Sequence, residues 1–226
     1  MKHYKLMRWH VWLGWLIGVP IIIWTASGLL MVAQPIETVR GNHLRSETPA
    51  LDAVKPVAPM LEGRQAKNLT LQQNDAGPYW VIAYADGGKR RADALTGALL
   101  PPVSATEADA LARAARSDEA AIRSVKRFDG DKAPGDQRSG RPSWQVVFDD
   151  DARFYIDADT GELIAVRTQF WRAFDFMWGL HIMDLQTRED TSHPILIIFA
   201  AISLLGSILG FVMLFTRRGR KRRAVT

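Results

Sequence analysis

The sequence predicts an α+β membrane protein in which two transmembrane helices flank a folded domain of two similar repeats. Two uncharged apolar blocks near the ends of the chain predict the helices. The polar region between the blocks contains one strand-and-turn pattern twice, which predicts the repeats. Basic residues gather outside both blocks, which predicts that the two chain ends lie on the same side of the membrane.

The first apolar block covers residues 9–33 and the second covers 193–216. Each exceeds the length of about 20 residues at which a helix spans ~30 Å of hydrocarbon while satisfying its own backbone groups. A cleaved signal peptide is the alternative for the first block, because basic residues precede it. However, the apolar region of a signal is only about 7–15 residues long, and no good cleavage site follows this block. We therefore expect the first block to be retained as a helix.

The basic residues at the two ends predict the orientation. They lie in an N-terminal segment, 1–8, and in a tail, 217–226, and positively charged loops stay in the cytoplasm. Nucleic-acid binding by the tail is the alternative, but its position beside a membrane span argues against it, and we expect lipid as the partner. Five tryptophans are expected at the membrane edges: Trp9, Trp12 and Trp15 at the inner edge, and Trp171 and Trp178 at the outer edge. The chain has no cysteine, which excludes disulfides and thiolate metal sites.

The region between the spans divides into four segments. They are a proline-rich tether at 34–65, a first unit at 66–103, a second unit at 104–168 and an amphipathic interfacial helix at 169–186. Within the second unit, Ser104 and Glu107 have the spacing of a capping box and predict a helix that runs to Arg116. The Gly- and Pro-containing segment Gly130–Pro142 is expected to be a surface loop.

The repeat is ungapped, with an offset of 64 residues between Trp80–Leu99 and Trp144–Leu163. Each copy reads as antiparallel strands joined by a turn at Thr-Gly. Asp159-Thr160-Gly161 also matches the signature of aspartic proteases, but its counterpart is Leu95-Thr96-Gly97, so two catalytic aspartates cannot be assembled. With no His-Glu-x-x-His or Gly-x-Ser-x-Gly motif either, the sequence gives no support for a peptidase.

A helix followed by strands that end in Asp-x-x-Thr-Gly-x-Leu resembles a PepSY domain, and two such units between membrane helices resemble the PepSY-associated transmembrane family. Arg8–Gly14, Thr25–Leu30 and Leu180-His181 are similar to motifs of its membrane helices. The resemblance extends distantly to larger iron-regulated membrane proteins and siderophore reductases. It implies b-type haem, electron transfer linked to iron or siderophore reduction, and the inner membrane of a bacterium with the central domain in the periplasm. The chain departs from those relatives in having two spans, and Ile182–Gln186 lacks the expected glycine-rich continuation.

Three histidines are candidate ligands of haem iron. His10 shares a helical stripe with Gly14 and Gly18, which could leave room for a macrocycle, although Gly14-x-x-x-Gly18 also suits helix packing around a histidine with no ligand. His181 lies on an apolar, aromatic stripe. It could be a ligand or could bond to a lipid headgroup or a backbone carbonyl.

His193 is either a ligand or part of an N-terminal cap with Ser192. Asp184 is a candidate to hold the second ring nitrogen of His181. His10 lies roughly 33 Å along the helix from its outer end at ~1.5 Å per residue, so it cannot share a haem with His181 or His193. Those two could share one haem if Asp184–Asp190 turns the chain, and in a parallel two-fold dimer His10 could meet His10 of the partner subunit across another. We expect a homodimer or a complex with another membrane or redox subunit.

The leading hypothesis is a membrane-anchored PepSY protein that binds haem b and transfers electrons across the inner membrane. Axial histidines on both faces of the iron would favour electron transfer over oxygen chemistry, because no coordination position stays open. The alternative is a non-catalytic periplasmic module, anchored by two helices, that binds or regulates another protein.

Overall fold

The computed structural model describes the backbone of residues 2–223 and the side chains of residues 7–215. His3 and most of the basic residues that predict the orientation lie outside the described side chains. The chain forms two compact units: a helical unit of residues 1–35 and 173–226, and a sheet domain of residues 36–172.

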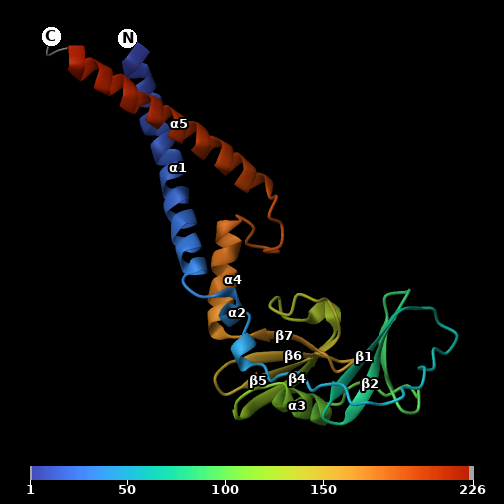
Figure 1. Cartoon of the computed structure of the whole chain (residues 1–226). Coiled ribbons are helices and arrows are strands. Elements are labelled where there is room, and N and C mark those ends of the chain that lie inside the picture. Colours follow the sequence, from blue (N-terminus) through green and yellow to red (C-terminus); the bar gives the residue numbers. More distant parts are fainter. Residues whose placement is uncertain (1, 224–226) are drawn as a thin grey trace. The chain divides into compact units, whose positions relative to one another are not determined.

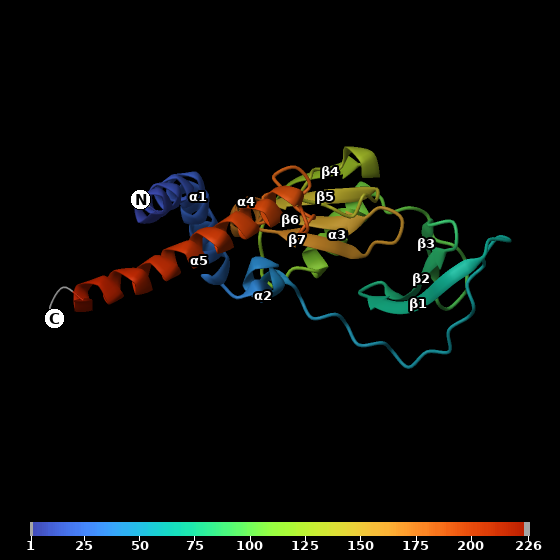
Figure 2. The same ribbon diagram turned by 90° about the horizontal axis from the view of Figure 1, so that it is seen from above.

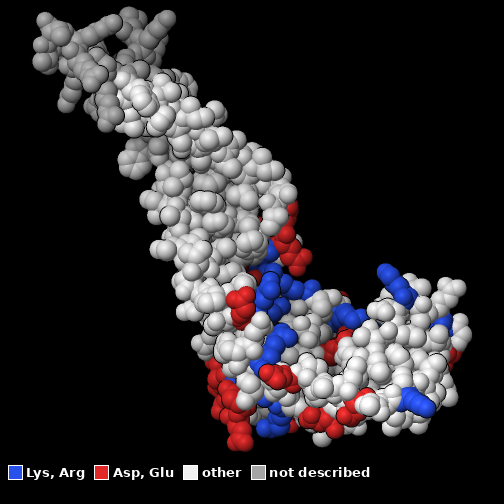
Figure 3. Space-filling view, in the orientation of Figure 1, with Lys and Arg blue, Asp and Glu red and all other residues white. Residues whose placement is uncertain are grey.

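The helical unit contains α1 (Lys2–Val32), most of α4 (Gln169–His181) and α5 (Pro194–Arg223) (Figure 1). The segments Met7–Val32 and Pro194–Phe215 are long and apolar enough to cross a membrane. Most of their apolar side chains are exposed in the isolated chain, as lipid-facing side chains are, whereas a helix from a soluble core would be buried. Figure 3 shows most of the length of the two spans without charged side chains, which lie on the sheet domain and beside it.

α1 and α5 run antiparallel and cross each other. The crossing is close because Gly206 of α5 has no side chain: a Cβ there would lie 2.8 Å from Cδ1 of Ile17. Gly206 and Gly210 form a Gly-x-x-x-Gly pattern on α5, which is therefore used for helix packing inside the chain.

The sheet domain consists of two antiparallel sheets, one of order β1-β2-β3 and one of order β4-β5-β6-β7. Its elements are α2 (Ile36–Val39), η1 (Asn42–Leu44), β1 (Ala66–Asn74), β2 (Gly77–Tyr84), β3 (Lys89–Asp93), α3 (Ala105–Ala114), β4 (Ile122–Phe128), η2 (Gly130–Lys132), β5 (Ser143–Phe148), β6 (Arg153–Asp157) and β7 (Leu163–Arg167). The α+β class is confirmed.

The two sheets repeat the same register. Tyr79 pairs with Asp93 in the first sheet, and Ser143 pairs with Asp157 in the second, 64 residues further on. In both copies the aspartate carboxylate accepts hydrogen bonds from the backbone N–H groups two and three residues further on. The second of these donors is Thr96 in the first copy and Thr160 in the second. The Thr-Gly sequence is therefore a structural turn closed by its aspartate.

The two sheets differ in how their equivalent faces are covered. α3 packs against β4, β5 and β6, with Ser104 as its N-cap, as the capping box predicts. The first sheet has instead the extended segment 57–65 over its buried residues Ile82 and Tyr84. Figure 2 shows the chain between η1 and β1 as a long trace without helix or strand. The second half of the predicted tether is thus part of the first unit.

Both repeat units contain an equivalent hydrogen bond from a tryptophan indole to a backbone carbonyl. The ring N–H of Trp80 donates to the carbonyl of Val57 over 2.7 Å, and that of Trp144 donates to the carbonyl of Val103 over 2.9 Å. The repeated tryptophans therefore hold the segment that enters each unit.

The segment Gly130–Pro142 covers the other face of the second sheet. Asp136 accepts hydrogen bonds from the Tyr155 hydroxyl (2.6 Å) and from Arg153 (3.1 Å), and Gln137 is only 2% exposed. Burial and the bond to Asp136 raise the pKa of Tyr155 above its usual value. The segment is a surface loop, as expected, since most of its residues are exposed or half-buried, and Asp136 and Gln137 anchor it through hydrogen bonds.

We expect Gly97→Ala to destabilise the protein by about 1–3 kcal/mol. Gly97 has φ +73°, and a Cβ there would lie 2.5 Å from the Ala58 carbonyl oxygen, so both backbone strain and a clash oppose the substitution. Denaturant unfolding of the purified protein, followed by tryptophan fluorescence, measures the change. Gly135→Ala is the matched control, since its Cβ would meet nothing within 4 Å; an equal loss in both variants would contradict the argument.

Candidate functional site

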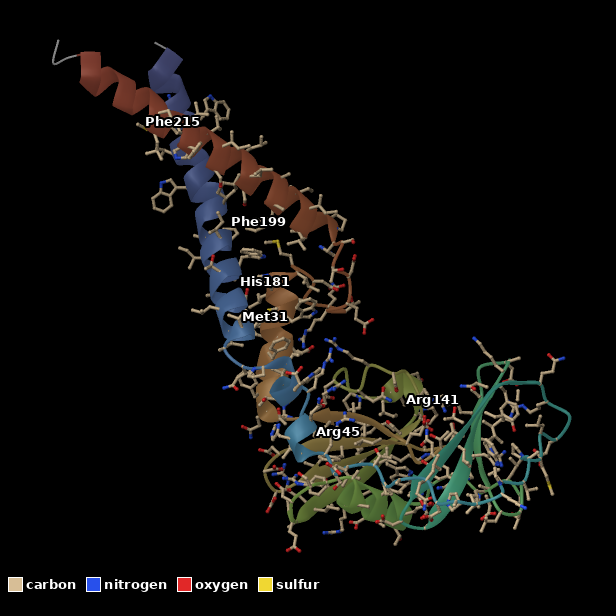
Figure 4. The ribbon with its side chains drawn as sticks, viewed as in Figure 1. Met31, Arg45, Arg141, His181, Phe199 and Phe215 are labelled. Atoms are coloured by element: carbon tan, nitrogen blue, oxygen red, sulfur yellow. The ribbon has the colours of Figure 1, made fainter. Side chains whose placement is uncertain are left out.

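His181 is the last residue of α4 and lies against α1 (Figure 4). Its Nδ1 is 3.1 Å from the Trp24 carbonyl oxygen and 3.1 Å from the Ser27 hydroxyl oxygen. The imidazole stacks on the indole of Trp24 with 4.5 Å between ring centroids. Its Cε1 would lie 3.1 Å from a Cβ at Gly28, so the absence of a side chain at this position makes room for the ring.

These contacts identify the ring nitrogen that carries the proton. The Trp24 carbonyl can only accept, and the Ser27 hydroxyl already donates to the same carbonyl over 2.8 Å. A hydrogen bond between Nδ1 and the Trp24 carbonyl requires the proton on Nδ1, and this tautomer leaves the lone pair of a neutral ring on Nε2. Such a backbone-anchored imidazole is the arrangement usual for histidines that bind metals.

Asp184 does not hold His181, contrary to expectation. Its carboxylate accepts hydrogen bonds from the Thr187 hydroxyl and from the backbone N–H groups of four residues that follow it: Gln186, Thr187, Glu189 and Asp190. The Thr187 hydroxyl, and then these amides, hold the pKa of Asp184 well below its usual range. Asp184 therefore stabilises the turn between α4 and α5. Its carboxylate bonds to donors in its own turn and not to the imidazole of His181.

His10 packs against α5. Its Cε1 and Nε2 would lie 3.0 and 3.5 Å from a Cβ at Gly210, and its Nδ1 is buried without a hydrogen-bond partner among the described residues. Gly14 and Gly18, expected beneath the same histidine, have nothing within 4 Å of their Cβ positions. A Cβ at either glycine would therefore have space in the single chain.

His193 immediately precedes α5, and its carbonyl accepts the backbone N–H of Ile197 over 3.2 Å, as the residue that starts a helix does. Its Nδ1 is also buried without a partner among the described residues. Among all the residues that the structure describes, no three His, Asp or Glu side chains form a group that could hold a metal ion by themselves.

The structure separates His10 from His181. The contacts of His181 on α1 are with residues 24–28, which lie 14–18 positions from His10, or roughly 21–27 Å along the helix at ~1.5 Å per residue. One haem cannot bridge them.

Trp171, expected near the outer membrane edge, is buried within the sheet domain. It is 8% exposed, and the guanidinium groups of Arg167 and Arg138 lie 4.1 and 5.5 Å from its ring centroid within the sheet domain. Stacking on arginine accounts for its position at the start of α4.

Sequence reasoning missed Trp24, Ser27 and Gly210 as neighbours of the histidines. A hydroxyl in an apolar helix, at Ser27, is a signal that something polar contacts it. Nothing in the sequence pairs Gly210 with His10, because that contact depends on the crossing of α1 and α5.

The family described as PepSY-associated TM region matches residues 7–226, nearly the whole chain. This chain belongs to that family. No curated protein and no solved structure gives a significant match to it. As a PepSY-associated membrane protein, it combines two transmembrane helices with a pair of antiparallel-sheet units, and its family membership and its helices together establish it as a membrane protein.

Proposed function

We propose that this PepSY-associated protein binds b-type haem through its membrane-proximal histidines and transfers electrons across the bacterial inner membrane. The observation that carries the proposal is the fixed imidazole of His181. Its Nδ1–H is held by the Trp24 carbonyl and the Ser27 hydroxyl, so Nε2 is a ready ligand for iron.

The other two candidates have the buried, unpartnered Nδ1 atoms expected of imidazoles that lack part of their environment. His193 is the candidate to act with His181, because the turn anchored by Asp184 joins the two. His10 is separate. Its ring packs directly on Gly210, so it suits haem only in an assembly in which a second copy of the chain, or another membrane subunit, completes the site.

The haem would supply one-electron chemistry, with iron or a siderophore as the expected acceptor. The residues of the chain orient the imidazole, and the stacked indole of Trp24 keeps one of its faces dry. The absorption spectrum of the purified protein, expressed with ample haem supply, tests the proposal. A Soret band with bis-histidine features is expected, and a colourless protein would overturn it.

A second candidate function is that of an anchored binding module without redox activity. The observation that favours it is a cleft of about 560 Å³ between the two units of the sheet domain. A module of this kind would purify without haem and keep its cleft.

We expect both chain ends in the cytoplasm and the sheet domain in the periplasm, because the ends carry the basic residues. A reporter fused after Thr226 should be active in the cytoplasm. A reporter inserted in Gly130–Gly140, or between Asp75 and Ala76 in an exposed turn, should be active outside. Activity of the Thr226 fusion outside the cell would contradict this orientation.

A further inference from the structure

The cleft between the two units of the sheet domain has an unusual composition. Its floor is apolar and includes Leu111, Ala114 and Leu163, and its walls are polar. One wall is the segment 45–49, and the other is the end of β1 with Tyr79. A volume of about 560 Å³ is within the ~300–1,000 Å³ usual for ligand sites.

A hydrogen-bonded chain fixes the wall at β1. The Tyr79 hydroxyl donates to the Gln72 side-chain oxygen (2.8 Å), and the Gln72 nitrogen donates to Glu162 (2.7 Å). Burial, with a contribution from Glu162, raises the pKa of Tyr79 to about 12, so the phenol stays protonated and this chain persists at neutral pH. Gln72 and Glu162 come from different units, so the cleft is held at a defined width.

Two polar atoms that line the cleft region lack partners. The side-chain nitrogen of Gln73 donates to the Asp52 carboxylate over 3.1 Å, which assigns the other amide atom as oxygen, and that oxygen is buried with no hydrogen bond. Nε of Arg45 is likewise buried with no acceptor among the described residues. Burial lowers the pKa of Arg45, as expected for a guanidinium without a paired carboxylate. Figure 4 shows Arg45 near η1, at the start of the extended segment.

The unpartnered atoms are one acceptor and one donor, the complement of the N–H and C=O groups of a peptide. Residues 47–49 form neither helix nor strand, and no backbone hydrogen bond ties them to another part of the described chain. Glu47 and Asp75 lie exposed in the cleft lining, and neither forms an ion pair with a described residue. These carboxylates favour a cation.

We propose that this cleft binds an extended peptide segment of a partner protein that carries a basic residue. Its backbone would pair with segment 47–49, donate to Gln73 and accept from Arg45, while its basic side chain would meet Glu47 and Asp75. This is the mode in which main-chain hydrogen bonds give affinity and side-chain contacts give specificity.

The test uses the full chain in lipid nanodiscs and fluorescein-labelled, C-amidated hexapeptide pools, each with Lys or Arg, or with Asp or Glu, fixed at one position. Fluorescence anisotropy should show that the basic pools bind at least fivefold more tightly than the acidic pools. Gln73→Leu and Arg45→Met should weaken the binding of all pools about tenfold, the effect of losing one hydrogen bond worth ~1.4 kcal/mol.

Glu47→Gln with Asp75→Asn changes exposed residues only, so this variant should fold and should lose the preference for basic pools. Glu119→Gln, an exposed carboxylate outside the cleft, should behave as the wild type. Binding of no pool, preference for acidic pools, or unchanged binding in the Glu47 and Asp75 variant would overturn the proposal. The Soret band of the same samples reports the haem proposal separately.

Discussion

Replacing His181 by alanine should abolish the haem absorption of its site while the protein still inserts into the membrane. Nδ1 of the imidazole is hydrogen-bonded to two oxygens of α1, and the ring stacks on Trp24. Alanine would remove the ring and with it the proposed iron ligand. The measurement is the haem-to-protein ratio of purified variants, from the Soret absorbance and a pyridine haemochrome assay.

Ser27→Ala is a second variant, for which we expect a smaller effect than for His181→Ala. It removes one acceptor of Nδ1 and leaves the Trp24 carbonyl, so haem should be retained with a shifted midpoint potential, since hydrogen bonding to a ligating histidine tunes its basicity. His43→Ala is the control, because its side chain is exposed in the sheet domain. Full haem content in the His181 variant would remove His181 from the ligand set.

Replacing Gly14 and Gly18 together by leucine should convert a homodimer into a monomer. The Cβ positions of both glycines meet nothing within 4 Å in the chain, so the open Gly-x-x-x-Gly face is available to a second copy. Bulky side chains would keep the α1 helices of two copies apart. Mass measurement in detergent should show at least a tenfold weaker association.

Two controls make this result specific. Val19→Leu enlarges an exposed apolar residue of α1 and should leave the dimer intact. Gly206→Leu should instead lower the stability of each chain, because Gly206 is in contact with Ile17 of α1. A wild-type monomer with bound haem would exclude the homodimer.

The sequence allowed the two spans, the paired units and the capped helix α3 to be predicted, because apolar length, exact repetition and capping are local signals. It did not predict that residues 57–65 would cover the first sheet, since an extended cover has no periodicity. The hydrogen bonds that anchor the loop Gly130–Pro142 were missed for a related reason, because they depend on partners distant in the sequence such as Tyr155.

For the candidate site, the sequence indicated which histidines lie on helices but not what they touch. Asp184 illustrates the limit: spacing placed it near His181, whereas the turn of its own loop satisfies its carboxylate. The contacts with Ser27 and Gly210 depend on how α4 and α5 pack on α1, which no pairwise spacing specifies.

The sheet domain begins and ends at nearly the same place. Gly41, near its start, is so close to Val166, near its end, that a Cβ on Gly41 would lie 2.7 Å from Cγ1 of Val166. Domains whose ends meet in this way tolerate transplantation between hosts, because the host needs only a gap of matching width. Residues 36–172 should therefore fold when inserted between a different pair of membrane helices, without changes to the domain or to the helices.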